Sequence, residues 1–383
     1  MSGGMRYGHL GRSGLLVSRI GLGTMDFGYT VDESTSFAVM DTAIEAGINL
    51  FDTADVYGGP QSADMAKGYG VSEETIGRWL KRSGRRDDIV LATKVYQPMG
   101  LGPNDRRLSA YHIRRACEAS LRRLQTDHID LYQMHHIDRA TPWEEIWQAM
   151  EQLVREGKIS YVGSSNFAGW DVALAQSAAT ARHFLGLTSE QSLYNLAVRA
   201  VERELIPALC HLGIGLIPYS PLHAGLLTGI LASATGQRAE AHRDQLEAYE
   251  DLCQELGAKP AHVALAWVLR NPAVSTTVTG HDERATAVQP RRALRTTRRP
   301  GHGTPRPHLA GPRGSPAGVC LVKQAPGRPT PRTAPLSRRR ALPGGNPTMV
   351  WIAGTSALTT RPTTAPTSGT SSSDGAPGSP RSR

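Results

Sequence analysis

An aspartate, a tyrosine, a lysine and a histidine stand where three short apolar segments end, and together they could transfer a proton. Asp52 ends one segment and Tyr57 lies just beyond it, while Lys94 and His135 end the next two. A tyrosine titrates near about 10 and is a poor proton donor at pH 7. A nearby ammonium favours tyrosinate and lowers that pKa by roughly 1–3 units. We therefore predict that Tyr57 protonates an oxygen, Lys94 activates it, Asp52 holds the lysine, and His135 orients the oxygen or relays the proton.

The elements that must position these side chains are short apolar segments alternating with stretches of helical length. Most of the segments are apolar on both faces, which is typical of a buried parallel sheet. The predicted strands are Ile20–Gly23, Asn49–Thr53, Ile89–Thr93, Ile129–Met134, Ile159–Ser164, Thr188–Gln191, Ile214–Tyr219 and Val274–Val278. The predicted helices are Asp32–Ala46, one that opens with Ser72 as its N-cap, Ala110–Leu124, Trp143–Arg155, Glu202–Leu212 and Ala261–Leu269.

Eight strands alternating with helices predict either a closed (β/α)8 barrel or a doubly wound sheet. The first strand leads into Gly21-Leu-Gly23 without a third glycine, which weakens the dinucleotide-fold alternative. In a barrel, the polar residues at the strand ends converge on one pocket. Tyr7–Leu10 and Leu15–Ser18 are predicted to form a small hairpin that plugs the bottom of the barrel.

The composition changes after Gly280, so we divide the chain into a barrel (residues 1–280) and a tail (residues 281–383). The tail holds 17 of the 43 Lys and Arg residues, 3 of the 34 acidic residues and 16 of the 25 prolines, and its net charge of +14 contrasts with −5 for the barrel. It has no sustained apolar period and is predicted to be disordered. The high pI therefore gives no reason to expect nucleic-acid binding by the barrel.

Two hypotheses concern this tail. Its arginine runs could bind nucleic acid, but we interpret them as the composition of a nonfunctional segment. The abrupt change inside the expected eighth strand–helix unit indicates that the tail comes from a shifted reading frame. Translating the coding DNA in the other two frames tests this: neither frame yielding an amphipathic helix with a basic residue soon after Gly280 would exclude it.

The remaining composition favours the cytoplasm. The cysteines Cys117, Cys210, Cys253 and Cys320 are scattered without a CxxC pair, which argues against a zinc site or a disulfide framework. The N-terminus has no apolar signal region, and no apolar run approaches 18 residues. We expect no metal and no membrane association; the sequence does not indicate an oligomeric state.

Five motifs stand at the ends of predicted strands: Phe51-Asp-Thr-Ala-Asp-Val-Tyr57-Gly, Ala92-Thr-Lys94, Asp130-Leu-Tyr-Gln-Met-His135, Gly163-Ser-Ser-Asn166-Phe and Pro218-Tyr-Ser-Pro-Leu222. They resemble those of the aldo-keto reductases, in the family's order and spacing. The similarity is greatest to the bacterial and potassium-channel-β-like branch and covers about residues 5–280. The resemblance implies a (β/α)8 barrel that uses NADP(H), without a metal, to reduce a small-molecule aldehyde or ketone.

The resemblance also implies roles for individual residues. Asp52, Tyr57, Lys94 and His135 would form the catalytic tetrad. Tyr219 would stack on the nicotinamide ring. The nicotinamide carboxamide would be held by Ser165, Asn166 and Gln191, and the pyrophosphate would be lined by Ser220, Leu222, Gly225 and Leu227. Further cofactor contacts are assigned to Gly23, Thr24, Met25, Asp52 and Pro221.

The chain departs from the family's pattern in two places. His136 stands where relatives often have Arg or Trp beside the substrate, so we expect it to alter specificity. After Gly280, Asp282 falls where a group that binds the adenosine 2′-phosphate is expected, and Pro290 would break the last helix. The eighth helix is therefore predicted to be missing or altered.

Two alternatives to the reductase remain. One is a regulatory protein that binds NADP(H) with negligible turnover, and the other is the inactive product of a damaged gene. Steady-state turnover with several aldehydes distinguishes the regulatory protein from an enzyme. Cofactor titration tests whether the chain is an inactive product that cannot hold the cofactor.

Overall fold

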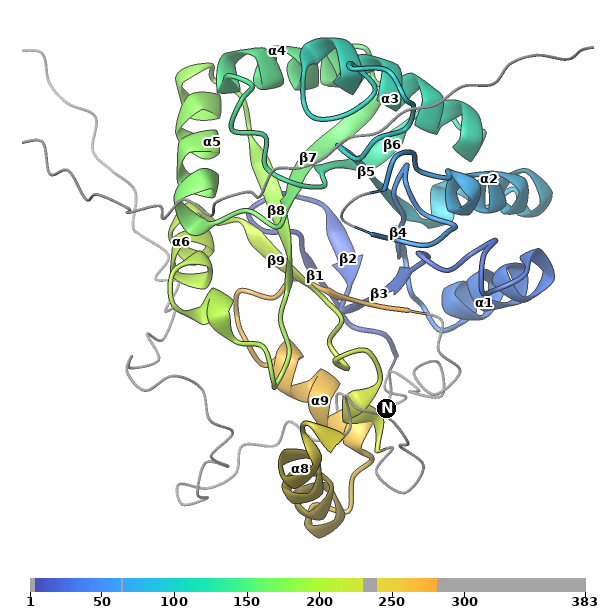
Figure 1. Ribbon diagram of the computed structural model, residues 1–383, viewed down its shortest axis with the longest axis vertical. Coiled ribbons are helices and arrows are strands. Elements are labelled where there is room, and N and C mark those ends of the chain that lie inside the picture. Colours follow the sequence, from blue (N-terminus) through green and yellow to red (C-terminus); the bar gives the residue numbers. More distant parts are fainter. Residues whose placement is uncertain (1–3, 63–64, 230–239, 281–383) are drawn as a thin grey trace, which may run out of the picture. The chain divides into compact units, whose positions relative to one another are not determined.

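Eight parallel strands form a barrel in the computed structural model, which describes residues 4–62, 65–229 and 240–280 (Figure 1). The strands follow one another in the order β10-β3-β4-β5-β6-β7-β8-β9, and every pairing is parallel. Their bounds are β3 (Ile20–Gly23), β4 (Leu50–Asp52), β5 (Val90–Val95), β6 (Ile129–Met134), β7 (Ile159–Ser165), β8 (Leu187–Leu193), β9 (Gly215–Tyr219) and β10 (Thr277–Thr279).

The two ends of this sheet meet, which decides for a closed barrel over a doubly wound sheet. Leu216 of β9 forms a parallel bridge with Val274. Its N–H donates to the Ala273 carbonyl at 2.8 Å, and its carbonyl accepts from the Ser275 N–H at 3.0 Å. The prediction of a (β/α)8 barrel is therefore confirmed.

The last strand differs from the predicted Val274–Val278, because β10 spans only Thr277–Thr279. If β10 began earlier, it would need the backbone carbonyls of residues 274 and 275 for strand pairing. The Arg19 guanidinium is already hydrogen-bonded to both of them. It donates to the carbonyl oxygens of Val274 at 2.5 Å and Ser275 at 2.8 Å, and also to that of Leu269 at 2.9 Å. A half-buried arginine thus replaces the first part of the predicted strand.

Helices surround the barrel and alternate with its strands (Figure 1). The helix α8 is an addition within the connection between β9 and α9. Neither α5 nor α8 was predicted; α5 is rich in alanine, which makes its apolar period weak. The bounds are α1 (Glu33–Glu45), α2 (Val71–Ser83), α3 (Ala110–Leu124), α4 (Trp143–Arg155), α5 (Gly169–Ala181), α6 (Leu205–Leu212), α8 (Arg243–Glu255) and α9 (Pro260–Leu269).

Ser72 is not the N-cap of α2, contrary to the prediction. The helix begins at Val71, and the cap is Gly70 with a φ of 77°. Ser72 is buried inside the first turn, where its hydroxyl donates to the Thr24 carbonyl at 2.7 Å and lies 2.9 Å from the Thr53 hydroxyl. The serine therefore ties α2 to the ends of β3 and β4, next to the predicted site.

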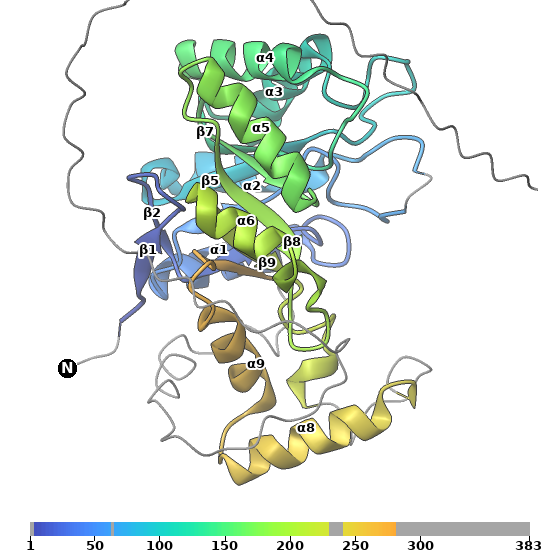
Figure 2. The same cartoon turned by 90° about the vertical axis from the view of Figure 1, so that its left-hand side faces the viewer.

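The N-terminal hairpin, β1 (Tyr7–His9) paired with β2 (Leu16–Ser18), covers the N-terminal end of the barrel (Figure 2). At its turn, Gly11 has a φ of 57°, and a Cβ there would lie 2.5 Å from the Thr188 carbonyl oxygen, so the position requires glycine. The predicted plug is confirmed, because two hairpin side chains pack with inward-facing strand residues. This cluster contains Leu10, Val17, Leu50, Val90, Ala92, Leu131, Ile217 and Val278.

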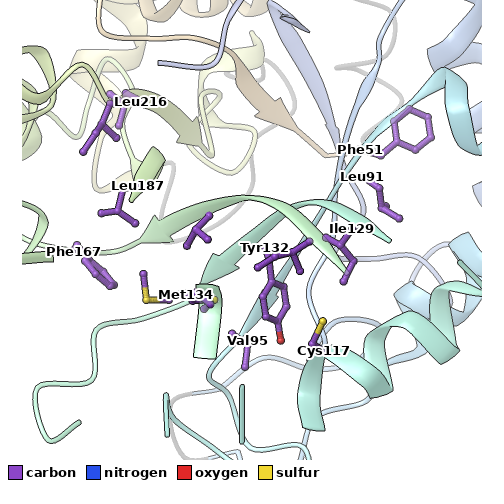
Figure 3. Close-up of a cluster of buried hydrophobic side chains, with 14 of the residues drawn as sticks. Phe51, Leu91, Val95, Cys117, Ile129, Tyr132, Met134, Phe167, Leu187 and Leu216 are labelled. Carbon is purple, nitrogen blue, oxygen red and sulfur yellow. The ribbon is translucent and has the colours of Figure 1, made fainter. Parts of the chain in front are cut away.

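The main apolar core lies between the strands and the surrounding helices. Figure 3 shows part of it, where Tyr132 of β6 and Cys117 of α3 lie among the side chains that join the two layers. The Tyr132 hydroxyl donates to the Ile113 carbonyl of α3 at 3.4 Å. This packing fixes each strand against its helix and so fixes the strand ends that carry the site.

Several expectations fall on residues 281–383, outside the described part of the chain. They are the disordered tail, the altered eighth helix and the residues expected near the 2′-phosphate. Within residues 4–62, 65–229 and 240–280, no helix is long and apolar enough to cross a membrane.

Candidate active site

The predicted tetrad is brought together at the C-terminal ends of the strands. Lys94 projects from β5, and its Nζ lies 2.6 Å from Asp52 Oδ2 at the end of β4 and 3.3 Å from the Tyr57 hydroxyl. The same hydroxyl lies 3.5 Å from Nε2 of His135, the residue after β6. One chain of contacts therefore runs from Asp52 through Lys94 and Tyr57 to His135.

Lys94 and Asp52 form a buried ion pair, with side-chain exposures of 0% and 5%. The ammonium also donates to the Thr53 carbonyl at 2.8 Å. Burial alone would lower the pKa of Lys94, but Asp52 and Tyr57 together raise it above its usual value. Lys94 therefore stays charged beside the tyrosine.

The second oxygen of Asp52 is satisfied by two glutamines. Oδ1 accepts from Nε2 of Gln133 and from Nε2 of Gln191, each at 2.9 Å. Such bonds matter, because a buried ion pair is tolerable only when its remaining lone pairs are satisfied. Gln191 was assigned to the nicotinamide carboxamide, but the structure places its amide nitrogen against Asp52.

Gln133 was missed by the sequence reasoning, although a signal for it exists. It lies two residues before His135, and alternate residues of a strand face the same side of the sheet. Gln133 therefore points into the barrel together with the histidine. The period-two pattern of β6 could have identified it.

Tyr57 has a raised pKa, which is the opposite of the predicted lowering. Burial raises the pKa; the Lys94 charge lowers it; and Asp52 raises it again. The predicted lowering rested on the ammonium alone and left out two opposing effects on the pKa of Tyr57, the loss of solvent and the charge of Asp52. Tyr57 is therefore protonated at neutral pH, the form that a proton donor requires.

His135 is neutral in this environment. Burial lowers its pKa well below the usual value, and the charge of Lys94 and the neighbouring His136 lower it further. The two imidazole rings stack with centroids 5.2 Å apart, and the His136 ring also lies 5.4 Å from that of Tyr96. A neutral imidazole that carries its proton on Nε2 can donate a hydrogen bond to an oxygen, which favours the orienting role over the relay.

Asn166 links three strand ends through its side-chain amide. Its backbone is left-handed, with a φ of 60°. The amide nitrogen donates to the His135 carbonyl at 3.2 Å, and the amide oxygen accepts from the Tyr219 hydroxyl at 3.0 Å. Ser165, the preceding residue, donates from its hydroxyl to the Gln191 carbonyl at 2.8 Å. Asn166 and the half-buried Tyr219 ring thus stand side by side at the mouth of the barrel.

The loop after β9 carries the residues assigned to the pyrophosphate. Ser220, His223 and Gly225 adopt left-handed backbone conformations, with φ values of 51°, 52° and 88°. The side chains of Leu222 and Leu227 are buried in a small apolar cluster with residues of α8 and α9. Any cofactor contact made by these two leucines would therefore come from their backbone.

The residues assigned after β3 separate into two kinds. Thr24 is buried, and its hydroxyl donates to the Asp52 carbonyl at 3.0 Å, so it braces the tetrad. Met25 is 45% exposed at the rim. A Cβ at Gly23 would lie 3.3 Å from the Thr279 carbonyl oxygen, which indicates close packing of β3 against β10.

A second acid, Asp55, is buried near the tetrad, with neither carboxyl oxygen hydrogen-bonded to any described residue. Burial raises its pKa well above the usual value, and the nearby Glu73 raises it further. The folded chain thus keeps a proton that the unfolded chain loses above about pH 4. Because the pKa of Asp55 is higher in the folded chain than in the unfolded chain, its contribution to the free energy of unfolding decreases with pH. The decrease runs from about pH 4 up to the folded-state pKa.

We expect Asp55→Asn to remove this pH dependence. The free energy of unfolding of the variant, relative to the wild type, should increase between pH 5 and pH 8, since asparagine has no proton to lose. Urea unfolding of both proteins at the two pH values measures the difference. Equal differences at both pH values would show that Asp55 is ionised in the fold.

Fold and site together define a (β/α)8 barrel in which an aspartate, a lysine, a tyrosine and a histidine are in contact at the C-terminal ends of the strands. The family model described as "Aldo/keto reductase family" matches residues 19–295. The chain belongs to the aldo/keto reductase family and is an oxidoreductase.

Individual relatives agree with this assignment. The chain is 53% identical over 289 residues to an uncharacterized oxidoreductase, YrpG, of Bacillus subtilis (strain 168), covering 72% of this chain and 87% of that protein. It is 35% identical over 312 residues to a probable voltage-gated potassium channel subunit beta of Oryza sativa subsp. japonica, covering 76% and 91%. It is 33% identical over 307 residues to versiconal hemiacetal acetate reductase of Aspergillus parasiticus, covering 70% and 86%.

Proposed function

We propose that this protein reduces an aldehyde or ketone to the alcohol with NADP(H). The observation that carries the proposal is the Tyr57 hydroxyl, which lies 3.3 Å from Lys94 Nζ and 3.5 Å from His135 Nε2. NADPH, when bound, supplies a hydride to the carbonyl carbon. The phenol of Tyr57 then gives its proton to the carbonyl oxygen, which completes the alcohol.

Each neighbour of Tyr57 assists this proton transfer. The ammonium of Lys94 stabilises the tyrosinate that forms as the proton leaves, and Asp52 keeps the ammonium in place at 2.6 Å. His135 donates from Nε2 to the carbonyl oxygen and so fixes it beside the phenol. The tyrosinate regains its proton from solvent, and the charges of the site return to their starting state.

The residues at the mouth of the barrel fit a nicotinamide group. Asn166 offers an amide that can exchange hydrogen bonds with a carboxamide, and Ser165 lies directly before it. The Tyr219 ring, tied to Asn166 at 3.0 Å, supplies a flat aromatic surface next to that amide. Ser220, Pro221 and Gly225 follow on the same loop and would hold the pyrophosphate.

An enzyme is favoured over a purely regulatory protein because all four side chains of the proton-transfer set are present and in contact. The chain is also similar to a probable potassium channel subunit beta, so the regulatory alternative needs a direct test. Steady-state oxidation of NADPH with aromatic and aliphatic carbonyls distinguishes the two. Turnover supports the reductase, and binding of NADPH without turnover supports the regulatory alternative.

We expect this protein to bind NADPH more tightly than NADH by only a small factor. A protein with a strong site for the 2′-phosphate would show a larger preference. The sequence places Asp282 and Glu283 after Gly280, where acids would repel that phosphate. Fluorescence titration with both cofactors measures the ratio of dissociation constants. A ratio above about a hundredfold, or ~2.7 kcal/mol, would show that another basic group binds the phosphate.

A further inference from the structure

Glu190 is a buried acid that the proposed chemistry does not use. It lies on β8 next to Gln191, and because successive strand residues face opposite sides, its side chain points away from the tetrad. Glu190 is fully buried, and burial raises its pKa to about 7. An acid in such a place costs stability unless it is well hydrogen-bonded. The groups that donate to the carboxyl oxygens of Glu190 therefore indicate its role in the fold.

Among the described residues, the groups that donate to Glu190 are neutral, and two of them belong to residues 164–167, the end of β7 and the start of the loop that carries Asn166. The Ser164 hydroxyl donates to Oε2. The Phe167 N–H donates to Oε1 at 3.1 Å, and the Ser192 hydroxyl donates to the same oxygen at 2.7 Å. The carboxyl group therefore binds the chain on both sides of Asn166, at the residue after it and at the second residue before it.

The backbone of the neighbouring Gln191 binds the middle of the same loop. Its carbonyl accepts from the Asn166 N–H at 3.0 Å and from the Ser165 hydroxyl at 2.8 Å. Asn166 is left-handed, a conformation that is uncommon outside glycine and persists when surrounding bonds impose it. The side chain of Glu190 and the backbone of Gln191 supply those bonds.

The position of Asn166 in turn sets the geometry of the mouth of the barrel. Its amide contacts the His135 carbonyl and the Tyr219 hydroxyl, so a rotation of this loop would move the proposed carboxamide contact and the aromatic surface together. We propose that Glu190 is a positioning residue, which holds Asn166 in its left-handed conformation and so prepares the mouth for the nicotinamide end of NADP(H). The inference rests on the proposed function.

Substitutions at Glu190 separate this role from general stability. Glu190→Met keeps the size but removes the acceptor. Glu190→Gln keeps an acceptor oxygen and reproduces the neutral form of the acid. Thr188→Val is the matched control, because Thr188 is buried on the same face of β8 and its hydroxyl donates to the Val162 carbonyl at 3.1 Å, away from the loop.

The measurement is NADPH affinity by fluorescence titration of each folded variant. We expect Glu190→Met to raise the dissociation constant about tenfold or more, as the loss of a hydrogen bond to a carboxyl group predicts. Glu190→Gln should stay within about threefold of the wild type, since a neutral acceptor can keep the Phe167 N–H. Thr188→Val should bind like the wild type, and kcat at saturating NADPH should fall less than affinity in Glu190→Met.

The outcomes are distinct. Wild-type affinity in Glu190→Met, or an equal loss in Thr188→Val, would overturn the positioning role while leaving the proposed function intact. A wild type that does not bind NADPH would overturn the proposed function itself. If Glu190→Met does not fold, Glu190→Asp decides: it keeps the acid but withdraws the carboxyl from Phe167, so weakened binding supports the proposal and unchanged binding overturns it.

Discussion

Replacing Tyr57 by phenylalanine should lower carbonyl reduction by at least about 10²-fold, and by up to about 10⁴-fold, because general acid catalysis contributes this much. The Tyr57 hydroxyl is the proton donor that lies between Lys94 and His135, at 3.3 Å and 3.5 Å. Phenylalanine keeps the ring and removes only that hydroxyl. Steady-state kcat with a saturating carbonyl and NADPH measures the loss.

The affinity for NADPH should change little in the Tyr57→Phe variant, because the proposed nicotinamide contacts lie on the loop after β7 and at the end of β9. Tyr194→Phe is a matched control: it also removes a hydrogen-bonded hydroxyl, which donates to Glu202 at 2.8 Å outside the site. The control should retain turnover. Full activity in Tyr57→Phe would remove this tyrosine from the mechanism.

Replacing Lys94 by methionine should abolish turnover and destabilise the fold by about 3–5 kcal/mol, the cost of leaving one member of a buried ion pair without its partner. Asp52, with 4% exposure, would lose its ion-pair partner and would keep, among the described residues, the amides of Gln133 and Gln191. Urea unfolding at pH 7 measures the change in the free energy of unfolding.

The double variant Asp52→Asn, Lys94→Met should recover much of this stability but none of the activity. Asparagine removes the uncompensated charge, and its side-chain oxygen can still accept from the two glutamines. This pattern separates the electrostatic role of Asp52 from the catalytic role of Lys94. A double variant no more stable than Lys94→Met would show that the loss of stability in Lys94→Met does not come from an uncompensated charge on Asp52.

Much of the fold could be predicted because its signals are local. The strand bounds Ile20–Gly23 and Ile129–Met134 agree between sequence and structure, since each is a short apolar run ended by a polar or glycine-rich segment. Long-range contacts set the places where the prediction was wrong. Arg19 binds the carbonyls at residues 274 and 275 and so delays β10, and Thr24 and Thr53 draw Ser72 into the core instead of leaving it as a cap.

The site shows the same division. The tetrad could be identified because its residues stand at strand ends in motifs that resemble a known family. The contacts between them could not, since they depend on side chains meeting inside the barrel. The period of β6 places Gln133 on the inner face, but its hydrogen bond to Asp52 could not be predicted for this reason. The pKa of Tyr57 was predicted in the wrong direction because burial outweighs the nearby ammonium.

The most direct test of the central claim is to follow NADPH and product together in one reaction. Wild-type protein is mixed with NADPH and each of a panel of aromatic and aliphatic aldehydes and ketones, and NADPH consumed is compared with alcohol formed. We predict that, with at least one carbonyl, the amount of NADPH consumed equals the amount of alcohol formed. The Tyr57→Phe variant should lose both NADPH consumption and alcohol formation. NADPH that binds but is consumed with none of the carbonyls would contradict the account and leave a nucleotide-binding protein without reductase activity.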